Sequence, residues 1–486
     1  MKSSNEQKQV FWFTLINYLG ILIGIGSTIF IYPNDKEFLG MVRYVDAIAQ
    51  LMFPILLFGA GQSLIYFYPL VNEENQKKLF KYAIKSILVI SVSLALLLIL
   101  GNYIVVLENY HFVFYAFPLA LIIALIELFK RQAINLQKLS VPTLLEKIIP
   151  KISFPIIFLM FLAGYLNVID GLKLFIASYF IIIVLLALYV FKYYKVNSDF
   201  NFKSLFTQID KKEYYRYSFY AFLGSFGSFL AFRLDVLMIP EFLSFEANGT
   251  YSIGVALVSV IGIPALGLFS IYAPMISEHL KNNAINELGK KYIETAKLLF
   301  FVGAILYGAI VLGIDSLFML LPTYDKLVET IPVIMILGAN VLFNMGTGFS
   351  SEIISYSKYY RVNIMLLFVL VFLNIFLNLY VLTQTDYGIE GVAWASLIAM
   401  VLFNTIKLYF IQKKFKILPF DKGYLKLFWI VFVVGLGLYF LPKTQNSLID
   451  LILKSGLFCV LNVFIVYKFK LIYSLNYWIE KVLRMK

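Results

Sequence analysis

The chain has little of what soluble enzymes and secreted domains usually depend on. Its 486 residues include one cysteine, Cys459, and two histidines, so an intramolecular disulfide framework and a cysteine-based zinc site are excluded. His111 and His279 lie far apart in the sequence, and we expect no metal site and no cofactor. Charged residues make up only 14% of the chain, whereas a soluble domain carries about 25%. This composition argues against a soluble protein.

Long apolar stretches make up most of the chain instead. Hydrophobic residues account for 61% of it and aromatic residues for 17%. Because a helix needs about 20 apolar residues to cross a bilayer, the sequence predicts an all-α integral membrane protein of about 14 transmembrane helices. The first stretch lacks an A-x-A cleavage site, and we expect it to be retained as a membrane span. The expected spans are residues 11–32, 43–70, 82–107, 112–130, 148–167, 172–194, 214–240, 250–276, 293–314, 327–354, 361–383, 388–411, 424–441 and 447–468.

The basic residues are distributed unevenly over the predicted loops. The net charge is +13, and most of the 41 lysines and arginines fall in or beside alternate loops, as in residues 77–85, 130–147, 203–216 and 413–416. Cytoplasmic loops of membrane proteins carry such an excess, so we expect both termini in the cytoplasm. Since the basic residues form no separate domain, nucleic acid is not an expected partner.

Two pairs of segments resemble each other within the chain. Residues 37–44 and 246–251 open spans two and eight, and residues 169–178 and 389–396 open spans six and twelve. This repeat predicts two pseudo-symmetric six-helix bundles around a central cavity, related by an axis along the membrane normal. The expected domains are an N-terminal half over 1–195, a cytoplasmic linker over 196–213, a C-terminal half over 214–412, and two extra helices with an amphipathic tail over 413–486.

Three stretches carry a resemblance to a known family. Residues 38–69 contain Phe-Leu-Gly and Pro-Ile-Leu-Leu-Phe-Gly, residues 233–253 contain Arg-Leu-Asp and Ala-Asn-Gly-Thr-Tyr, and residues 374–396 contain Asn-Ile-Phe-Leu-Asn and Tyr-Gly-Ile-Glu-Gly. In these motifs the chain resembles the polysaccharide (O-antigen and capsule type) lipid-linked oligosaccharide flippases of the multidrug/oligosaccharidyl-lipid/polysaccharide exporter superfamily. The resemblance implies a bacterial cytoplasmic (inner) membrane protein whose central cavity opens alternately to the two sides.

Charged residues inside the predicted spans are the first candidates for function, because each costs about 2.5–3.5 kcal/mol near the bilayer centre. Arg233 and Asp235 lie in span seven, and residues two apart do not face each other on a helix. A guanidinium suits phosphate oxygens, so Arg233 is a candidate for binding a lipid pyrophosphate. The alternative for Arg233 is snorkelling to the outer interface. Asp235 matches an acidic position of the family and is a candidate for binding substrate or the coupling ion.

Three other charged residues are candidates for the substrate or ion pathway. Arg43 lies near the outer end of span two and can pair with Asp46, either as a substrate gate or as an end-of-helix ion pair. Glu127 is a candidate for ion coupling, although its spacing from Arg131 also permits an intrahelical ion pair. Glu352, near the inner end of span ten, is a candidate for proton or sodium coupling.

Glycine and proline interrupt spans two and eight at corresponding places. Matched interruptions in the two halves of a transporter point to moving, substrate-lining helices, although membrane helices also tolerate both residue types. The hinge candidates are Pro54, Gly59, Gly61, Gly262, Pro264 and Gly267.

The function implied by the resemblance is translocation of an undecaprenyl-pyrophosphate-linked oligosaccharide from the cytoplasmic to the outer leaflet, for surface polysaccharide biosynthesis. We expect a monomeric transporter rather than an enzyme, in contact with membrane lipid, with H⁺ or Na⁺ as coupling ion and a polysaccharide polymerase as candidate partner. The sequence contains no G-x-x-x-x-G-K-[ST] nucleotide motif. The alternatives are a multidrug cation antiporter of the same superfamily, a flippase for the peptidoglycan lipid precursor, and a membrane glycosyltransferase or polymerase, which the short outer loops disfavour.

Overall fold

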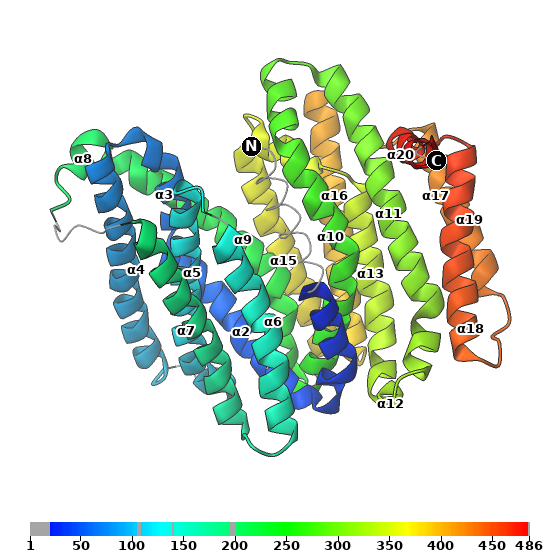
Figure 1. Cartoon of the computed structure of the whole chain (residues 1–486), viewed down its shortest axis with the longest axis horizontal. Coiled ribbons are helices and arrows are strands. Elements are labelled where there is room, and N and C mark those ends of the chain that lie inside the picture. The colour runs from blue at the N-terminus through cyan, green and yellow to red at the C-terminus, as the bar shows by residue number, and fades with distance from the viewer. Residues whose placement is uncertain (1–19, 105–107, 139, 195–200, 485–486) are drawn as a thin grey trace. The chain divides into compact units, whose positions relative to one another are not determined.

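The computed structural model describes residues 20–104, 108–138, 140–194 and 201–484, and all regular elements within these ranges are helical (Figure 1). Twelve of the described helices are long and apolar enough to cross a membrane. Two further helices coincide with predicted spans: Gly20–Asn34 is shorter, and Ser140–Leu162 contains Glu146, Lys147 and Lys151. The predicted all-α membrane fold with about 14 spans is therefore confirmed. The part of the first span before residue 20 lies outside the described residues.

The chain divides into two compact units, Met1–Gly249 and Thr250–Lys486. The helix α9, which the sequence predicts to open the second half, packs on α2 and α3 in the first unit. The predicted six-helix halves stay a prediction. The helices of the first unit, after Gly20–Asn34, are α2 (Lys36–Leu57), α3 (Ala60–Phe67), α4 (Glu73–Gly101), α5 (Val113–Asn135), α6 (Ser140–Leu162), α7 (Val168–Tyr193), α8 (Leu205–Gln208) and α9 (Lys211–Phe242).

The helix α10 (Phe245–Lys281) begins at the end of the first unit and continues into the second. The remaining helices of the second unit are α11 (Ile285–Met319), α12 (Tyr324–Leu327), α13 (Ile331–Gly346), α14 (Ser350–Tyr356), α15 (Tyr360–Gln384), α16 (Gly388–Phe415), α17 (Lys422–Tyr439), α18 (Ser447–Leu451), α19 (Leu457–Lys468) and α20 (Tyr473–Arg484). A π-helical turn, Ile452–Gly456, joins α18 to α19.

Short polar side chains define where several of these helices begin. The side chains of Asp35, Asn72, Asn167 and Asp421 each accept a hydrogen bond from a backbone N–H in the first turn that follows. Such caps satisfy N–H groups that the helix itself leaves without a partner. They mark the beginnings of α2, α4, α7 and α17, so the sequence itself specifies these ends of the membrane helices.

Each unit has its own apolar interior. In the first unit, α2 packs on α5 and α9, and its Phe38 stacks on Phe161 with ring centroids 4.1 Å apart. In the second unit, α11 packs on α13 and α17, and Phe300, Leu427 and Phe458 form part of one buried cluster. Burial of such side chains is the main favourable contribution to packing in the water-exposed parts, whereas close van der Waals contact dominates within the bilayer.

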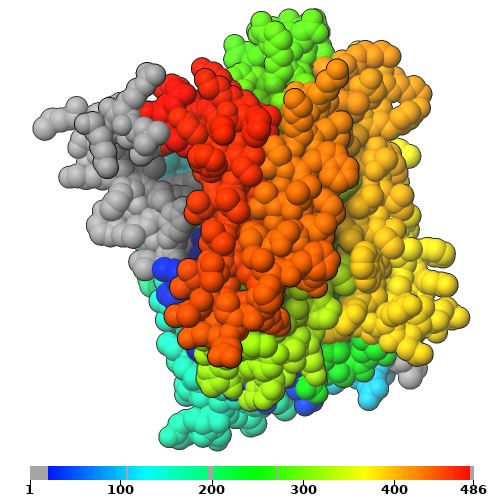
Figure 2. Space-filling view, turned by 90° about the vertical axis from the view of Figure 1, so that its right-hand side faces the viewer, coloured from blue at the N-terminus to red at the C-terminus, as the bar shows by residue number. Residues whose placement is uncertain are grey.

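The helices α17 and α19 lie at the surface of the second unit, where Figure 2 shows them in orange and orange-red. Trp429, Val433 and Val460 are all more than half exposed on these two helices. A face of this kind suits contact with lipid chains. At the end of the chain, α20 presents exposed Tyr477 and Trp478, consistent with the amphipathic tail expected from the sequence.

Candidate functional site

The helix of predicted span two is interrupted in the first unit. Phe58 (φ 41°) and Gly59 (φ 72°) adopt the left-handed conformation between α2 and α3, four residues after Pro54. A Cβ on Gly59 would lie 2.0 Å from the backbone oxygen of Ser218 in α9, so only glycine fits. The hydroxyls of Ser63 and Ser218 lie 2.7 Å apart and hold α3 against α9. Of the hinge candidates, Gly59 therefore stands at a real break in the helix.

Span eight shows no corresponding interruption. The helix α10 is continuous through Gly262, Pro264 and Gly267. Proline removes only one hydrogen bond from a helix, and membrane helices accommodate this loss. The hinge role of these three residues stays a prediction.

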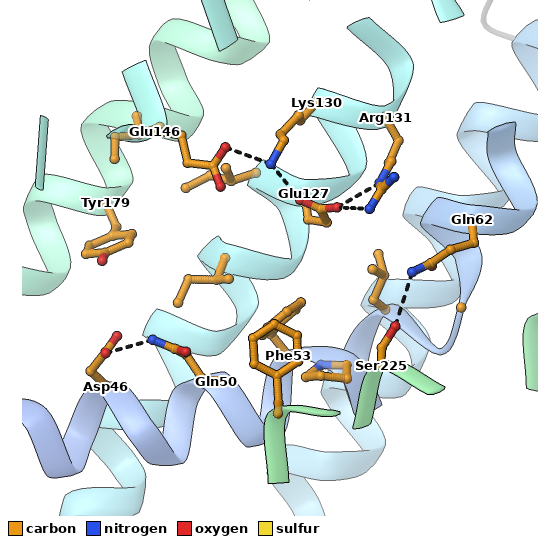
Figure 3. Close-up of a pocket in the computed structure, with 17 residues that line it drawn as sticks. Asp46, Gln50, Phe53, Gln62, Glu127, Lys130, Arg131, Glu146, Tyr179 and Ser225 are labelled. Carbon is orange, nitrogen blue, oxygen red and sulfur yellow. Dashed lines mark hydrogen bonds and ion pairs between the residues drawn. The ribbon is translucent and has the colours of Figure 1, made fainter. Parts of the chain in front are cut away.

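A cavity of about 440 Å³ lies in the first unit beside the break (Figure 3). Six helices, α2, α3, α5, α6, α7 and α9, contribute its walls, and many of the side chains are polar or charged, although four of these helices are long and apolar enough to cross a membrane. Among the described residues, no group of three His, Cys, Asp or Glu side chains could hold a metal ion. The lining residues are Asp46, Gln50, Phe53, Pro54, Leu57, Gly59, Gln62, Ile123, Ile126, Glu127, Lys130, Arg131, Glu146, Tyr179, Ile182, Ser225 and Phe229.

Four charged side chains form a continuous network along one wall of this cavity (Figure 3). Glu127 Oε1 accepts Nε and Nη2 of Arg131 at 2.7 and 2.6 Å, and Glu127 Oε2 lies 3.3 Å from Lys130 Nζ. Lys130 also lies 2.8 Å from Glu146 on α6. The intrahelical pair that the sequence permits is present, and Glu146 extends it to a second helix. A role for Glu127 in ion coupling stays a prediction.

Two buried side-chain oxygens on the cavity wall, one of a carboxylate and one of an amide, lack hydrogen-bond partners. Asp46 is 5% exposed, and its Oδ2 accepts Gln50 Nε2 at 2.7 Å while its Oδ1 is buried without a partner. Gln62 donates to Ser225 Oγ at 3.2 Å, and its Oε1 is likewise buried and without a partner. Because leaving such groups unsatisfied is costly, these oxygens suit a donor or cation that enters the cavity.

The predicted substrate residues lie near this cavity but do not line it. Arg43 is half-buried on α2 with its guanidinium 5.5 Å from the Phe154 ring centroid, and Arg233 and Asp235 are half-buried on α9. The charges of Arg43 and Arg233 both act on the hydroxyl of Tyr179, which lines the cavity. Both predicted arginines therefore lie within electrostatic range of one wall residue, as do Asp46 and Glu146. Their role in binding substrate stays a prediction.

A second interruption occurs in the second unit, between α13 and α14. Gly348 has φ 61°, and a Cβ there would lie 3.1 Å from Ala296 and from Tyr292 of α11. Tyr424 of α17 donates a hydrogen bond to the Gly346 oxygen at 3.0 Å. The sequence analysis did not anticipate this break, because span ten contains no proline at this point.

A polar cluster surrounds the second break. Asn404 of α16 donates to Asn344 of α13 at 3.2 Å, and Lys407 Nζ of α16 donates to Ser351 Oγ of α14 at 2.8 Å. Lys407 is 2% exposed. The predicted residue Glu352 lies next to Ser351, is half-buried, and has a buried Oε2 without a hydrogen-bond partner. Glu352 and Lys407 interact electrostatically.

An apolar groove of about 310 Å³ also lies in the second unit. Its walls come from α11, α13, α17 and α19, and they are almost entirely hydrocarbon and aromatic. The groove is lined by Phe300, Ala304, Tyr307, Gly308, Val311, Leu312, Leu342, Phe428, Val431, Phe432, Gly435, Leu436, Tyr439 and Phe458.

Two site residues were missed by the sequence analysis for different reasons. Glu146 was placed in a loop, because the predicted span began at residue 148, whereas α6 begins at Ser140. Lys407 lies four residues before the end of the predicted span 388–411, where a lysine resembles the basic residues that follow it. A signal for its burial is present, since Met400, Phe403 and Asn404 precede it at helical spacing on one buried face.

No protein-family model matches the chain, and no curated protein sequence matches it. Solved structures do share its fold. The inward-closed structure of the lipid II flippase MurJ has a TM-score of 0.70 and 13% identity, over 94% of this chain and 99% of that one. An inward-facing multidrug resistance MATE family transporter of the MOP superfamily has a TM-score of 0.63 and 12% identity, over 82% and 94% of the two chains. An outward-facing structure of such a MATE transporter has a TM-score of 0.56 and 12% identity, over 82% and 95%.

These likenesses and the apolar helices define a class. The chain is a multi-pass membrane protein with the fold found in MurJ and in MATE transporters of the MOP superfamily. Within that fold, the first unit holds a charged cavity and the second holds a buried polar cluster and an apolar groove.

Proposed function

We propose that this protein is a flippase that moves an undecaprenyl-pyrophosphate-linked oligosaccharide from the cytoplasmic to the outer leaflet of the bacterial cytoplasmic membrane. The product would serve the synthesis of surface polysaccharide such as O-antigen or capsule. Transport would proceed by alternating access, with both termini in the cytoplasm. The observation that carries the proposal is the charged cavity in the first unit, within a fold that MurJ shares.

The cavity offers positive charge to an anionic headgroup. Lys130 and Arg131 line it, and Arg43 and Arg233 act on its wall residue Tyr179. Among the lining residues, these two cations stand against the three carboxylates of Asp46, Glu127 and Glu146, and Arg43 and Arg233 add positive charge from beyond the cavity wall. A pyrophosphate crossing a membrane needs such partners, because charge in an apolar medium is costly unless it is compensated.

The groove of the second unit offers a surface for the lipid tail. It is lined by aromatic and aliphatic side chains such as Phe300, Tyr307 and Phe432. A polyprenyl chain is long, branched and wholly apolar, so it gains contact with such walls without leaving polar groups unsatisfied.

The proposal is tested by the leaflet distribution of the lipid-linked oligosaccharide in cells with and without this protein. The outer-leaflet fraction is measured in spheroplasts with a membrane-impermeant glycosidase. We expect the oligosaccharide lipid to accumulate on the cytoplasmic leaflet when the protein is absent. Replacing both arginines, Arg43→Gln with Arg233→Gln, should lower outer-leaflet appearance roughly tenfold or more, because each lost charge-assisted hydrogen bond costs about 1.5–3 kcal/mol.

A matched control is available at the surface. Lys173 pairs with Asp170 at 3.3 Å, and its side chain is 62% exposed, so Lys173→Gln should restore flipping fully. An unchanged leaflet distribution in cells that lack the protein would refute the proposal. A double arginine variant that flips like the wild type at equal abundance would remove the role assigned to the two cations.

Two other substrates are each favoured by one observation. The partnerless oxygens of Asp46 and Gln62 on the cavity wall suit a cationic drug, and increased sensitivity to cationic drugs in the deletion strain would identify an antiporter. The likeness to MurJ extends over 94% of the chain, against 82% for the MATE structure. Rescue of cells depleted of their lipid II flippase would assign the peptidoglycan precursor instead.

A further inference from the structure

A lysine is buried inside a membrane-spanning helix of the second unit without a carboxylate in contact. Lys407 is 2% exposed and lies eight residues, or about 12 Å, before the end of α16. Its Nζ donates to the hydroxyl of Ser351 at 2.8 Å and lies 4.3 Å from the centroid of the Phe403 ring. A hydroxyl and an aromatic face are partners that can hold a cation.

The ionisable groups around Lys407 are few. On α14, Glu352 interacts with it through its charge, and one oxygen of this carboxylate is buried without a hydrogen-bond partner. The neighbouring helix α13 contains no ionisable side chain, and α15 contains one charged residue, Arg361, whose Nε lies 3.3 Å from the Tyr360 hydroxyl. The phenols of Tyr292 and Tyr424 complete the surroundings of the break.

The charge of a second buried lysine in the same unit is compensated by a carboxylate in direct contact. Lys454 lies 3.4 Å from Asp450, one helical turn away, and the side chains are 8% and 4% exposed. Asp450 also accepts a hydrogen bond from Ser316 at 2.8 Å. A buried charge held in this way is structural, because losing either partner leaves the other uncompensated. Lys407 has no such contact with Glu352, so its charge is free to change.

We propose that Lys407 and Glu352 form a proton-binding site in the second unit, in which Lys407 carries the exchangeable proton. The ammonium contacts the hydroxyl and the aromatic ring that a coupling metal cation would need, and the Glu352 carboxylate acts on it only through its charge. The site therefore takes H⁺ and not Na⁺. The role of this site in coupling rests on the proposed function, whereas proton binding by Lys407 does not.

The exchange balances in protons and charge. In the protonated form, the Lys407 ammonium donates to Ser351 Oγ, and the Glu352 carboxylate balances its charge. When the proton leaves to water, the neutral amine can accept the Ser351 hydroxyl hydrogen instead. The hydrogen bond to α14 persists while the positive charge disappears, and the uncompensated carboxylate then favours rehydration of the site.

The position of the site connects this change to the backbone. Ser351 and Glu352 begin α14 immediately after Gly348, where the helix is interrupted. The Asn404 side chain, one turn before Lys407, contacts Asn344 on the other side of the same break. Helix α16 thus contacts span ten on both sides of the interruption, through Asn404 before it and Lys407 after it, and loss of the Lys407 charge would weaken the attachment of α14 to α16.

The test measures charge movement in the absence of substrate. The full-length protein is reconstituted in proteoliposomes on a solid-supported membrane, and the external pH is stepped. Proton binding within the membrane dielectric should give a transient capacitive current in the wild type. Lys407→Arg should fold, because it keeps a cation in the site, but should lose the transient, since a guanidinium does not release its proton. Glu352→Gln should move the half-maximal transient to lower pH.

Lys454→Arg is the matched control, because it makes the same substitution at the compensated lysine, and it should keep the wild-type transient. A sodium step at constant pH should give no current that depends on Lys407. The proposal is wrong if the wild type gives no pH-step transient, if Lys407→Arg keeps it, or if a sodium-step current is lost in Lys407→Arg. Since no oligosaccharide lipid is present, these outcomes leave the flippase proposal untouched, and a failed leaflet assay leaves the proton site untouched.

Discussion

In the part of the chain that the structure describes, each compact unit contains a membrane span broken at a glycine of positive φ, and the two breaks differ in what packs against them. Between α2 and α3, Gly59 presses against the backbone of α9 at Ser218. Between α13 and α14, Gly348 packs against the side chains of Ala296 and Tyr292 on α11. An added Cβ at Gly59 would overlap a backbone atom at 2.0 Å, whereas one at Gly348 would make tight contacts of 3.1 Å that shifts of a few tenths of an ångström can relieve. The first joint is therefore sterically fixed, whereas the second has room to adjust.

The chemistry beside the two joints differs as well. The first joint adjoins a cavity whose charges are paired in a network of Glu127, Lys130, Arg131 and Glu146. The second adjoins Lys407, whose ammonium contacts a hydroxyl instead of a carboxylate. The comparison suggests a division of labour in which the first unit offers a fixed binding surface and the second contains the element that responds to protons.

The largest effect is expected for Gly59→Ala. The added methyl group would lie 2.0 Å from the Ser218 oxygen at a residue with φ 72°, so we expect a loss of about 3 kcal/mol in the free energy of unfolding. The measurement is denaturant unfolding of the purified protein in detergent. Gly267→Ala is the control, because a Cβ there meets no atom within 4 Å, and it should be neutral or slightly stabilising. Equal stability of the two variants would show that the first joint is not fixed by this contact.

A smaller effect is expected for Gly348→Ala. The methyl group would lie 3.1 Å from two side chains, at φ 61°, and small shifts of Ala296 and Tyr292 relieve part of the clash. We expect a loss of about 2 kcal/mol in the same unfolding measurement. A loss larger than that of Gly59→Ala would reverse the order of the two joints and contradict the comparison.

The smallest effect is expected far from the second joint, at Lys443. Its Nζ lies 2.5 Å from Asp315, on α11 but about 28 Å along that helix from Ala296. The hydrogen bond to Asp315 raises the pKa of Lys443 above its usual value of 10.5. A raised pKa means that the stabilisation is present below this usual value and is lost as pH rises through the folded-state value. Because the lysine is 63% exposed, the contribution is about 0.5 kcal/mol.

The contribution of this ion pair is measured as the difference in the free energy of unfolding between the wild type and Lys443→Met at increasing pH. The difference should be small near neutral pH and should vanish in strongly alkaline solution. A difference comparable to that of Gly348→Ala would mean that this exposed ion pair, and not the joint, dominates the stability of the second unit.

Much of the architecture follows from the sequence, because the bilayer restricts what a chain can do. Without water to satisfy the backbone, each apolar stretch of sufficient length has to form a helix, so the spans and their order could be predicted. The ends of α2, α4, α7 and α17 are set by local caps such as Asp35 and Asn72. The Glu127 ion pair depends only on helical spacing, and it too could be predicted.

The interruptions and the identity of the site residues were decided by tertiary structure. Proline and glycine occur in both span two and span eight, yet α10 continues through Pro264 while the helix of span two breaks at Gly59, because the approach of α9 excludes any side chain at Gly59. In the same way, Lys407 lies near the end of a predicted span, close to other basic residues, and it is buried because α13, α14 and α15 pack against α16. The length of an apolar stretch and the cap of a helix depend on residues that are close together in the sequence, so both can be predicted from it. Close approach and burial depend on which helices meet, and that is set by contacts between residues distant in the sequence.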